Sequence, residues 1–230
     1  MVDHAVLGQR PQATFDLLAA RGARSPAHGQ ILLRAAADRG EVAVVARLLN
    51  IGADARAVTP GRWVVHADCA KLLLEAGSDV NHAPSRWSSW IWLSCNANNG
   101  KRDDPELIEA LLNAGADVHA RAFGKTALHF ACKAGFVETT RLLLEAGADP
   151  NALDGDGLTP LWSALQSGPS VEREPVVRQL LSGGASPRAL NPKGITLRQA
   201  VAAQTNRPSA ERQTLLRLLS LRRSTRIRGG

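Results

Sequence analysis

Leucine-rich runs recur along this chain, and a small residue, a glycine and a polar residue follow most of them. The clearest copies read LLEAGAD at 143–149, LLEAGSD at 73–79 and LLNAGAD at 111–117. Val137, Leu142, Leu143 and Leu144 form the apolar stripe of an amphipathic helix that runs into the first of these copies. A glycine just beyond a helix adopts the left-handed conformation that ends it. The pattern therefore predicts a series of amphipathic helices, each ended by a glycine.

These copies repeat at a roughly constant period. Their glycines stand at positions 22, 52, 77, 115, 147 and 184, with intervals of 30, 25, 38, 32 and 37 residues. Such self-similarity is typical of a solenoid, in which no unit buries its apolar face alone and stacked neighbours complete the core. The chain is therefore predicted to form one continuous array whose extended surface is suited to binding.

A second motif precedes the leucine-rich run in each of the best units. Thr126 and Thr159 are suited to the N-cap of a short helix, where the hydroxyl accepts a backbone N–H. Pro160 then falls in the first helical turn, where a missing N–H costs nothing. Each unit is thus predicted to contain two helices. The motif reads GKTALHFA at 124–131 and GLTPLWSA at 157–164.

Together the two motifs resemble the repeats of the ankyrin family, which are about 33 residues long and carry the signature Gly-x-Thr-Pro-Leu-His-x-Ala. The resemblance covers residues 15–200 of this chain. It implies an all-α ankyrin-repeat solenoid of helix–turn–helix units with short β-hairpin loops, comprising about six units and capping helices. It also implies a concave side, formed by the hairpins and first helices, that contacts partners.

We divide the chain into an N-terminal cap at 1–28, repeats at 29–200, and a C-terminal capping helix with a basic tail at 201–230. Unit three leaves little room for a first helix between Thr59 and Cys69. Units four and six carry polar, turn-rich insertions at 98–105 and 168–175. The predicted units span about 29–53, 54–77, 78–115, 116–147, 148–184 and 185–221.

Composition narrows the function classes. No stretch approaches the ~20 apolar residues of a membrane span, and the N-terminus lacks the basic and apolar regions of a secretory signal. The three cysteines, Cys69, Cys95 and Cys132, are odd in number and widely spaced, which favours reduced thiols over a disulfide framework. We therefore expect a cytoplasmic protein, with the nucleus also compatible.

The basic excess of the chain lies at one end. The formal net charge is +7, and residues 198–230 hold eight arginines against one acidic residue, Glu211. Binding of nucleic acid or an anionic membrane would therefore have to use this tail. The alternative is a capping helix at 211–222 that buries its leucines and leaves its arginines in water.

Aromatic and charged residues at the predicted hairpins are the candidates for partner contacts. Trp87 and Trp90 replace signature residues near a helix start, and tryptophan is enriched among binding hot spots. Trp90 could instead fill the gap left by the short unit three, and charged hairpin residues could simply be solvated. The full set of predicted partner-binding residues is Arg86, Trp87, Trp90, Arg121, Phe123, Lys125, Leu153 and Asp156.

Reactive residues give no catalytic or metal pattern. The resemblance implies that the His129 imidazole hydrogen-bonds backbone between repeats. His66 and Cys69 could share a helix face, but two ligands do not make a zinc site. We expect no cofactor, no metal and no enzymatic activity. The predicted function is binding of another protein by a monomer, and the two alternatives are an enzyme or small-ligand site at the irregular junction of units three and four, and a basic-tail tether.

Overall fold

A computed structural model describes residues 26–58, 66–81, 103–166, 173–204 and 208–220. Within these ranges the chain is helical, with one two-stranded hairpin. The elements are α2 (Pro26–Asp38), α3 (Val42–Asn50), the 3-10 helix η2 (Ala55–Ala57), α4 (Ala67–Glu75), α6 (Pro105–Asn113), β1 (Arg121–Ala122), β2 (Lys125–Thr126), α7 (Ala127–Ala134), α8 (Val137–Glu145), α9 (Pro160–Gln166), α10 (Arg173–Ser182), α11 (Leu197–Ala203) and α12 (Ser209–Leu218).

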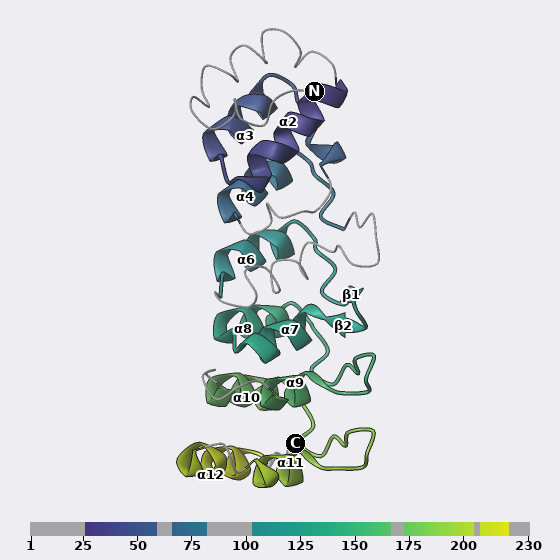
Figure 1. Ribbon diagram of the computed structural model, residues 1–230, viewed down its shortest axis with the longest axis vertical. Helices are drawn as coiled ribbons and strands as arrows, with labels where there is room; N and C mark the ends of the chain where they lie inside the picture. The colour runs from purple at the N-terminus through teal and green to yellow at the C-terminus, as the bar shows by residue number, and fades with distance from the viewer. Residues whose placement is uncertain (1–25, 59–65, 82–102, 167–172, 205–207, 221–230) are drawn as a thin grey trace, which may run out of the picture.

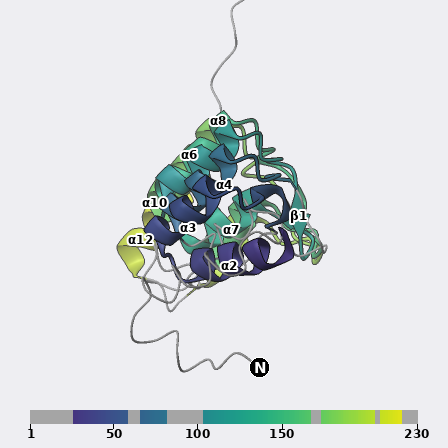
Figure 2. The same ribbon diagram turned by 90° about the horizontal axis from the view of Figure 1, so that it is seen from above.

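Helix pairs stack along the long axis of the molecule, and the loops between pairs project to one side (Figure 1). Seen along the stack, the second helices α3, α4, α6, α8 and α10 lie along one edge, and β1 lies on the opposite side (Figure 2). Packing joins successive units, as between α7 and α9 and between α8 and α10. This arrangement confirms the predicted all-α repeat solenoid.

The leucine pairs of the repeated motif supply the core. In each pair the first leucine is almost fully buried, and the second is half-buried against one of the core clusters. The core forms two clusters that meet at α6, which contributes Ile108 to one and Leu107 to the other. The buried first leucines are Leu48, Leu73, Leu111, Leu143 and Leu180.

The helix ends follow the sequence signals closely. Thr126 is the N-cap of α7, and Gly135 ends that helix in the left-handed region with φ 80°. Helix α8 begins at the predicted Val137 and ends at Glu145. Thr140 is fully buried in α8, where its hydroxyl donates to the Phe136 carbonyl at 2.6 Å. The predicted cap at Thr159 is wrong in one respect, because its buried hydroxyl makes no hydrogen bond among the described residues.

Two adjacent aspartates cap two different helices. Asp104 caps its own helix α6 by accepting a hydrogen bond from the Leu107 N–H at 3.2 Å. Asp103 reaches the next unit and accepts from the Glu138 N–H at 3.0 Å and from the Thr139 hydroxyl at 2.5 Å. Its carboxylate therefore satisfies free N–H groups at the start of α8 and ties two repeats together.

The C-terminal end is held by an apolar face and one ion pair. Helix α12 buries Leu215 and Leu218, and Leu219 is buried just beyond it. The buried Arg173 side chain contacts Glu211 at 2.9 Å.

Several other predictions fall on residues outside the described ranges. They concern the first helix of unit three, Arg86, Trp87, Trp90, Cys95, most of both insertions and the tail beyond residue 220.

Candidate functional site

The loops that project from the stack begin with the same turn. In the loop that starts at Asp149, the carboxylate accepts the Asn151 N–H at 2.8 Å. Asp54, Asp79 and Asp117 accept the N–H two residues onward in the same way. Aspartate favours such turns because its side chain can replace a backbone acceptor. We call the three loops at 117–126, 149–159 and 186–196 the finger row.

Asparagine side chains connect successive loops at their bases. The Asn151 amide nitrogen donates to the Gly184 carbonyl at 3.0 Å, and its oxygen accepts the Ser186 N–H at 2.8 Å. Asn81 makes the same pair of bonds to Gly115 and Asp117, at 2.9 and 2.8 Å. The sequence marks these asparagines only as turn residues, because a bridge to the next repeat has no local signature.

The first finger differs from the other two in its turn. It has one residue fewer between its opening aspartate and its threonine than the second finger, and β1 pairs with β2 across a two-residue turn. Both turn residues have positive φ, 52° at Phe123 and 73° at Gly124. Positive φ suits glycine, but it is a strained conformation for a bulky side chain such as phenylalanine.

The second and third fingers wrap around an internal side chain instead. Oδ1 of Asp154 accepts the N–H groups of Asp156 and Leu158 at 2.9 and 2.8 Å. Asn191 accepts those of Lys193 and Ile195 at 3.0 and 2.9 Å. In each loop, one buried or half-buried acceptor therefore fixes the turn.

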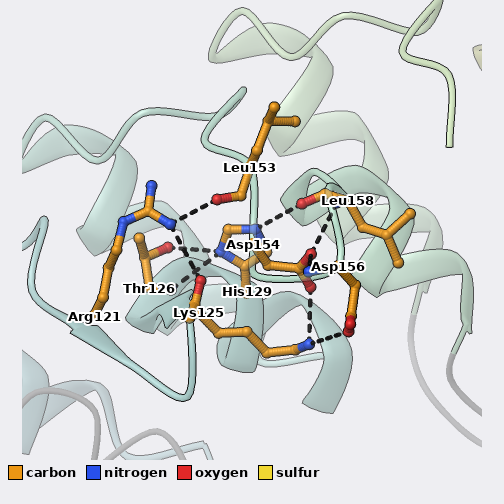
Figure 3. Close-up of polar contacts among 9 residues, drawn as sticks. Arg121, Lys125, Thr126, His129, Leu153, Asp154, Asp156 and Leu158 are labelled. Atoms are coloured by element: carbon orange, nitrogen blue, oxygen red, sulfur yellow. Dashed lines mark hydrogen bonds and ion pairs between the residues drawn. The ribbon is translucent and has the colours of Figure 1, made fainter. Parts of the chain in front are cut away.

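Polar contacts tie the first finger to the second (Figure 3). The Arg121 guanidinium donates to the carbonyls of Gly124 and Leu153 at 3.1 and 2.6 Å. Lys125 Nζ lies 2.8 Å from Oδ2 of Asp154 and 3.4 Å from Oδ2 of Asp156. These contacts fix the relative positions of the two loops.

The ion pair shifts both titrating groups toward their charged forms. Burial alone would raise the pKa of Asp154, but the contact with Lys125 and the two backbone N–H groups outweigh it and lower the pKa. The hydrogen bond to Asp154 raises the pKa of Lys125. Both groups therefore stay charged near neutral pH, which keeps the two fingers connected.

Close backbone packing also joins these two fingers. A Cβ atom added at Gly124 would lie 2.9 Å from the Cα and N atoms of Gly155. That distance is shorter than side chains tolerate, so the two turns can approach this closely only because residue 124 is a glycine.

His129 links the base of the first finger to the second. Its Nδ1 accepts the Thr126 N–H at 3.2 Å and lies 2.8 Å from the Thr126 hydroxyl, while its Nε2 lies 3.1 Å from the Leu158 carbonyl. A backbone N–H can only donate and a carbonyl can only accept, so the proton must sit on Nε2. Burial lowers the pKa of this imidazole, which keeps it neutral.

Trp162 takes the same position one repeat later. Its indole N–H donates to the Ala189 carbonyl at 3.1 Å, as His129 donates to Leu158. Indole has no second nitrogen to serve as an acceptor. This difference explains why the Thr159 hydroxyl has no hydrogen-bond partner in the described part of the chain, whereas the Thr126 hydroxyl has one.

Apolar side chains stand exposed on the fingers. The exposed fractions are 57% for Phe123, 54% for Leu153 and 54% for Leu190. The structure thus brings five predicted residues together on two adjacent loops, and Leu190 extends the set to a third loop. Sequence reasoning missed Leu190 because unit seven departs from the repeat signature. The five residues are Arg121, Phe123, Lys125, Leu153 and Asp156.

The described residues offer little reactive chemistry. Burial, with smaller contributions from Asp68 and Glu41, raises the pKa of the Cys69 thiol to about 11, so a thiolate is disfavoured. Within the described ranges, no three His, Cys, Asp or Glu side chains cluster as metal ligands would. None of the described helices combines the length and apolar character needed to cross a membrane.

Comparison with known proteins identifies the repeats. Residues 93–191 match the model of the family described as ankyrin repeats (3 copies). The chain therefore contains ankyrin repeats of this family. Its fold is similar to the crystal structure of an ankyrin repeat domain from Acinetobacter baumannii AYE, with a TM-score of 0.66 and 26% identity, covering 81% of this chain and 95% of that one.

Curated relatives share the repeats but are much longer. Ankyrin repeat and SOCS box protein 11 of Danio rerio is 50% identical over 96 residues, which are 42% of this chain and 31% of that protein. Ankyrin repeat and KH domain-containing protein mask-1 of Caenorhabditis elegans is 35% identical over 104 residues, which are 45% of this chain and 4% of that protein. The match therefore spans less than a third of either relative. Ankyrin repeats generally bind other proteins.

Proposed function

We propose that this ankyrin-repeat protein binds another protein, without catalysis, through the hairpin tips and first helices of its central repeats. The observation that carries the proposal is the finger row itself. Three successive loops each expose a large apolar side chain, Phe123, Leu153 and Leu190, on backbones that hydrogen bonds already fix. A row of exposed apolar tips on an ordered scaffold is typical of a binding surface.

Pre-organisation favours binding through these tips. Binding normally costs conformational entropy when loops become ordered. Here Arg121 and Lys125 hold the first finger against the second, and Asn151 holds the base of the second finger to the base of the third. We therefore assign these three residues the role of positioning the loops, and we assign the partner contacts to the apolar tips and the exposed Asp156.

The strained turn supports Phe123 as the central anchor. A non-glycine residue at positive φ costs roughly 1–3 kcal/mol, and such strain concentrates at binding sites. Aromatic side chains also dominate binding hot spots because they bury much area with little entropy loss. The predicted contacts of Arg86, Trp87 and Trp90 remain part of this proposal for the preceding unit.

Two core side chains support a non-catalytic role. The raised pKa of Cys69 disfavours a nucleophilic thiolate. Both ring nitrogens of His129 already hold backbone groups, so this imidazole has no nitrogen left to act as a general base.

Site-specific photo-crosslinking tests the proposal. A photoreactive residue placed at 123 or 153 should trap the same partner from host lysate, and one placed at Val42, on the outer helix α3, should not. With that partner purified, Phe123→Ala and Leu153→Ala should each weaken binding about tenfold or more, a loss typical of hot spots. Val42→Ala, which also truncates a partly exposed side chain, should leave the affinity unchanged. Equal affinity for all three variants would refute the finger row as the binding site.

A further inference from the structure

One position in the loops alternates between asparagine and other residues. It is the residue two places after the aspartate or serine that opens each loop, and we call it the bridge position. Asn81 and Asn151 occupy it and join a glycine carbonyl and a backbone N–H of the next repeat. Each bridging carboxamide thus satisfies one acceptor and one donor at the same time.

Arg56 occupies the bridge position in the loop between α3 and α4. Its Nε lies 3.2 Å from Oδ1 of Asp54, and 78% of its side chain is exposed, so it does not cross to the next repeat. The groups that an asparagine would join there are the Gly77 carbonyl and the Asp79 N–H. Within the described ranges, neither group has a hydrogen-bond partner.

An open hollow lies at this place. Its lining includes Arg56 at the bridge position and Gly77, whose carbonyl corresponds to the Gly115 carbonyl that Asn81 reaches one repeat later. The lining residues are Gly52, Ala53, Asp54, Ala55, Arg56, Ala76 and Gly77. The hollow therefore adjoins the Gly77 carbonyl, which is one of the two groups that a bridging carboxamide would join, and the Asp79 N–H follows two residues later.

We infer that this hollow binds a primary carboxamide, the side chain of an asparagine or glutamine on a bound protein. The site offers one acceptor, the Gly77 carbonyl, and one donor, the Asp79 N–H. A primary carboxamide presents its oxygen and one N–H on the same side, as Asn81 and Asn151 show. A trans peptide group presents them on opposite sides, and a carboxylate has no proton to donate to Gly77.

The small binding free energy available at this site indicates that the carboxamide belongs to a larger ligand. Two neutral hydrogen bonds at an exposed site do not by themselves give even millimolar affinity. The carboxamide must therefore be delivered by a protein that makes other contacts. The Arg56 guanidinium at the rim of the hollow is suited to meet a carbonyl or carboxylate beside it.

His119 provides a comparison. It also replaces the asparagine at the bridge position, and within the described ranges Gly147 O and Asp149 N have no partner either. We assign the site to Arg56 because an open hollow lined by Arg56 and Gly77 lies there.

Nuclear magnetic resonance with acetamide as the probe tests the site without any partner. The reporter is the backbone amide of Asp79, and the internal controls are the amides of Asp117 and Ser186, which asparagines already bridge. Acetamide at molar concentration, as its weak affinity requires, should shift the Asp79 resonance several-fold more than either control, and the same concentration of N-methylacetamide or acetate should not. The substitution R56N should shift Asp79 in the absence of acetamide and abolish its response, because the new side chain fills the hollow.

Each outcome of the titration either supports or overturns the proposed carboxamide site. Equal shifts at Asp79 and at the control amides would overturn the site, and so would an equal response to N-methylacetamide. Saturation by acetamide at micromolar concentration would instead indicate a free small amide as the ligand and overturn the protein source. The titration involves neither Phe123 nor Leu153. A negative titration would therefore not argue against the finger row as a binding site, and a negative result for the finger row would not argue against the carboxamide site.

Discussion

Replacing Asn151 with alanine tests the physical basis of repeat stacking. The substitution removes two inter-repeat hydrogen bonds, at 3.0 Å to the Gly184 carbonyl and at 2.8 Å from the Ser186 N–H. A hydrogen bond contributes a net ~0.5–1.5 kcal/mol, and the groups left behind here are exposed and can bind water. We therefore expect Asn151→Ala to lower the free energy of unfolding by about 1–2 kcal/mol.

The loss of stability should affect particular repeats more than others, in addition to lowering the overall free energy of unfolding. In a solenoid each repeat contacts only its neighbours, so a weakened interface lets the units beyond it open first. Hydrogen exchange measured by NMR should therefore speed up in α11 and α12 more than in α3 and α4. Urea unfolding gives the total change in free energy.

Asn113→Ala is the matched control. Asn113 is the exposed last residue of α6, and among the described residues its side chain makes no hydrogen bond. Asn113→Ala removes the same side-chain atoms as Asn151→Ala but no hydrogen bond between repeats. It should therefore not cause the loss of stability that is specific to the bridge. If the two variants unfold at the same urea concentration and exchange alike, the asparagine bridge does not stabilise the stack and the reasoning fails.

Three further predictions follow from neighbouring features. Phe123→Gly should raise the free energy of unfolding by about 1 kcal/mol, because glycine tolerates the positive φ, yet it should weaken partner binding; a variant that is less stable than the parent in urea would contradict the strained turn. Arg56→Asn should stabilise the chain by about 1 kcal/mol by forming the missing bridge, and an unchanged urea midpoint would count against it. The lowered pKa of His129 predicts that stability is complete above the ordinary histidine pKa of about 6.5 and falls as pH drops below it, because the unfolded chain binds a proton that the folded chain does not; His129→Gln should flatten this dependence between pH 7 and 5 in urea titrations, and an equally steep slope in that variant would refute the assignment.

Sequence reasoning identified the features that depend on local chemistry. The glycine after each leucine pair, the cap at Thr126 and the start of α8 at Val137 all follow from signals within a few residues, and the structure has them there. These predictions succeed because helix ends and faces are set by neighbouring residues.

The contacts between repeats could not be predicted in the same way. The sequence predicts Lys125 as a partner-binding residue, and in the structure its ammonium group is paired with the carboxylates of Asp154 and Asp156 in the next loop. Asp103 caps a helix 34 residues further along the chain, at Val137. Such contacts join residues 29 or more positions apart, and no periodicity in the sequence indicates which side chain crosses to the neighbouring repeat.

The bonds that cross between repeats have a consequence for how this chain can change. The side chains of Asn151, His129 and Trp162 each reach a main-chain carbonyl of the following repeat. A main-chain carbonyl is present whatever the amino acid, so these three bonds require no particular side chain on the receiving repeat. Unit seven can therefore stack correctly although it has lost most of the signature. A foreign repeat grafted after α10 should dock in the same way, provided that its loop keeps the same path, which makes the length of a loop a stricter constraint than its composition.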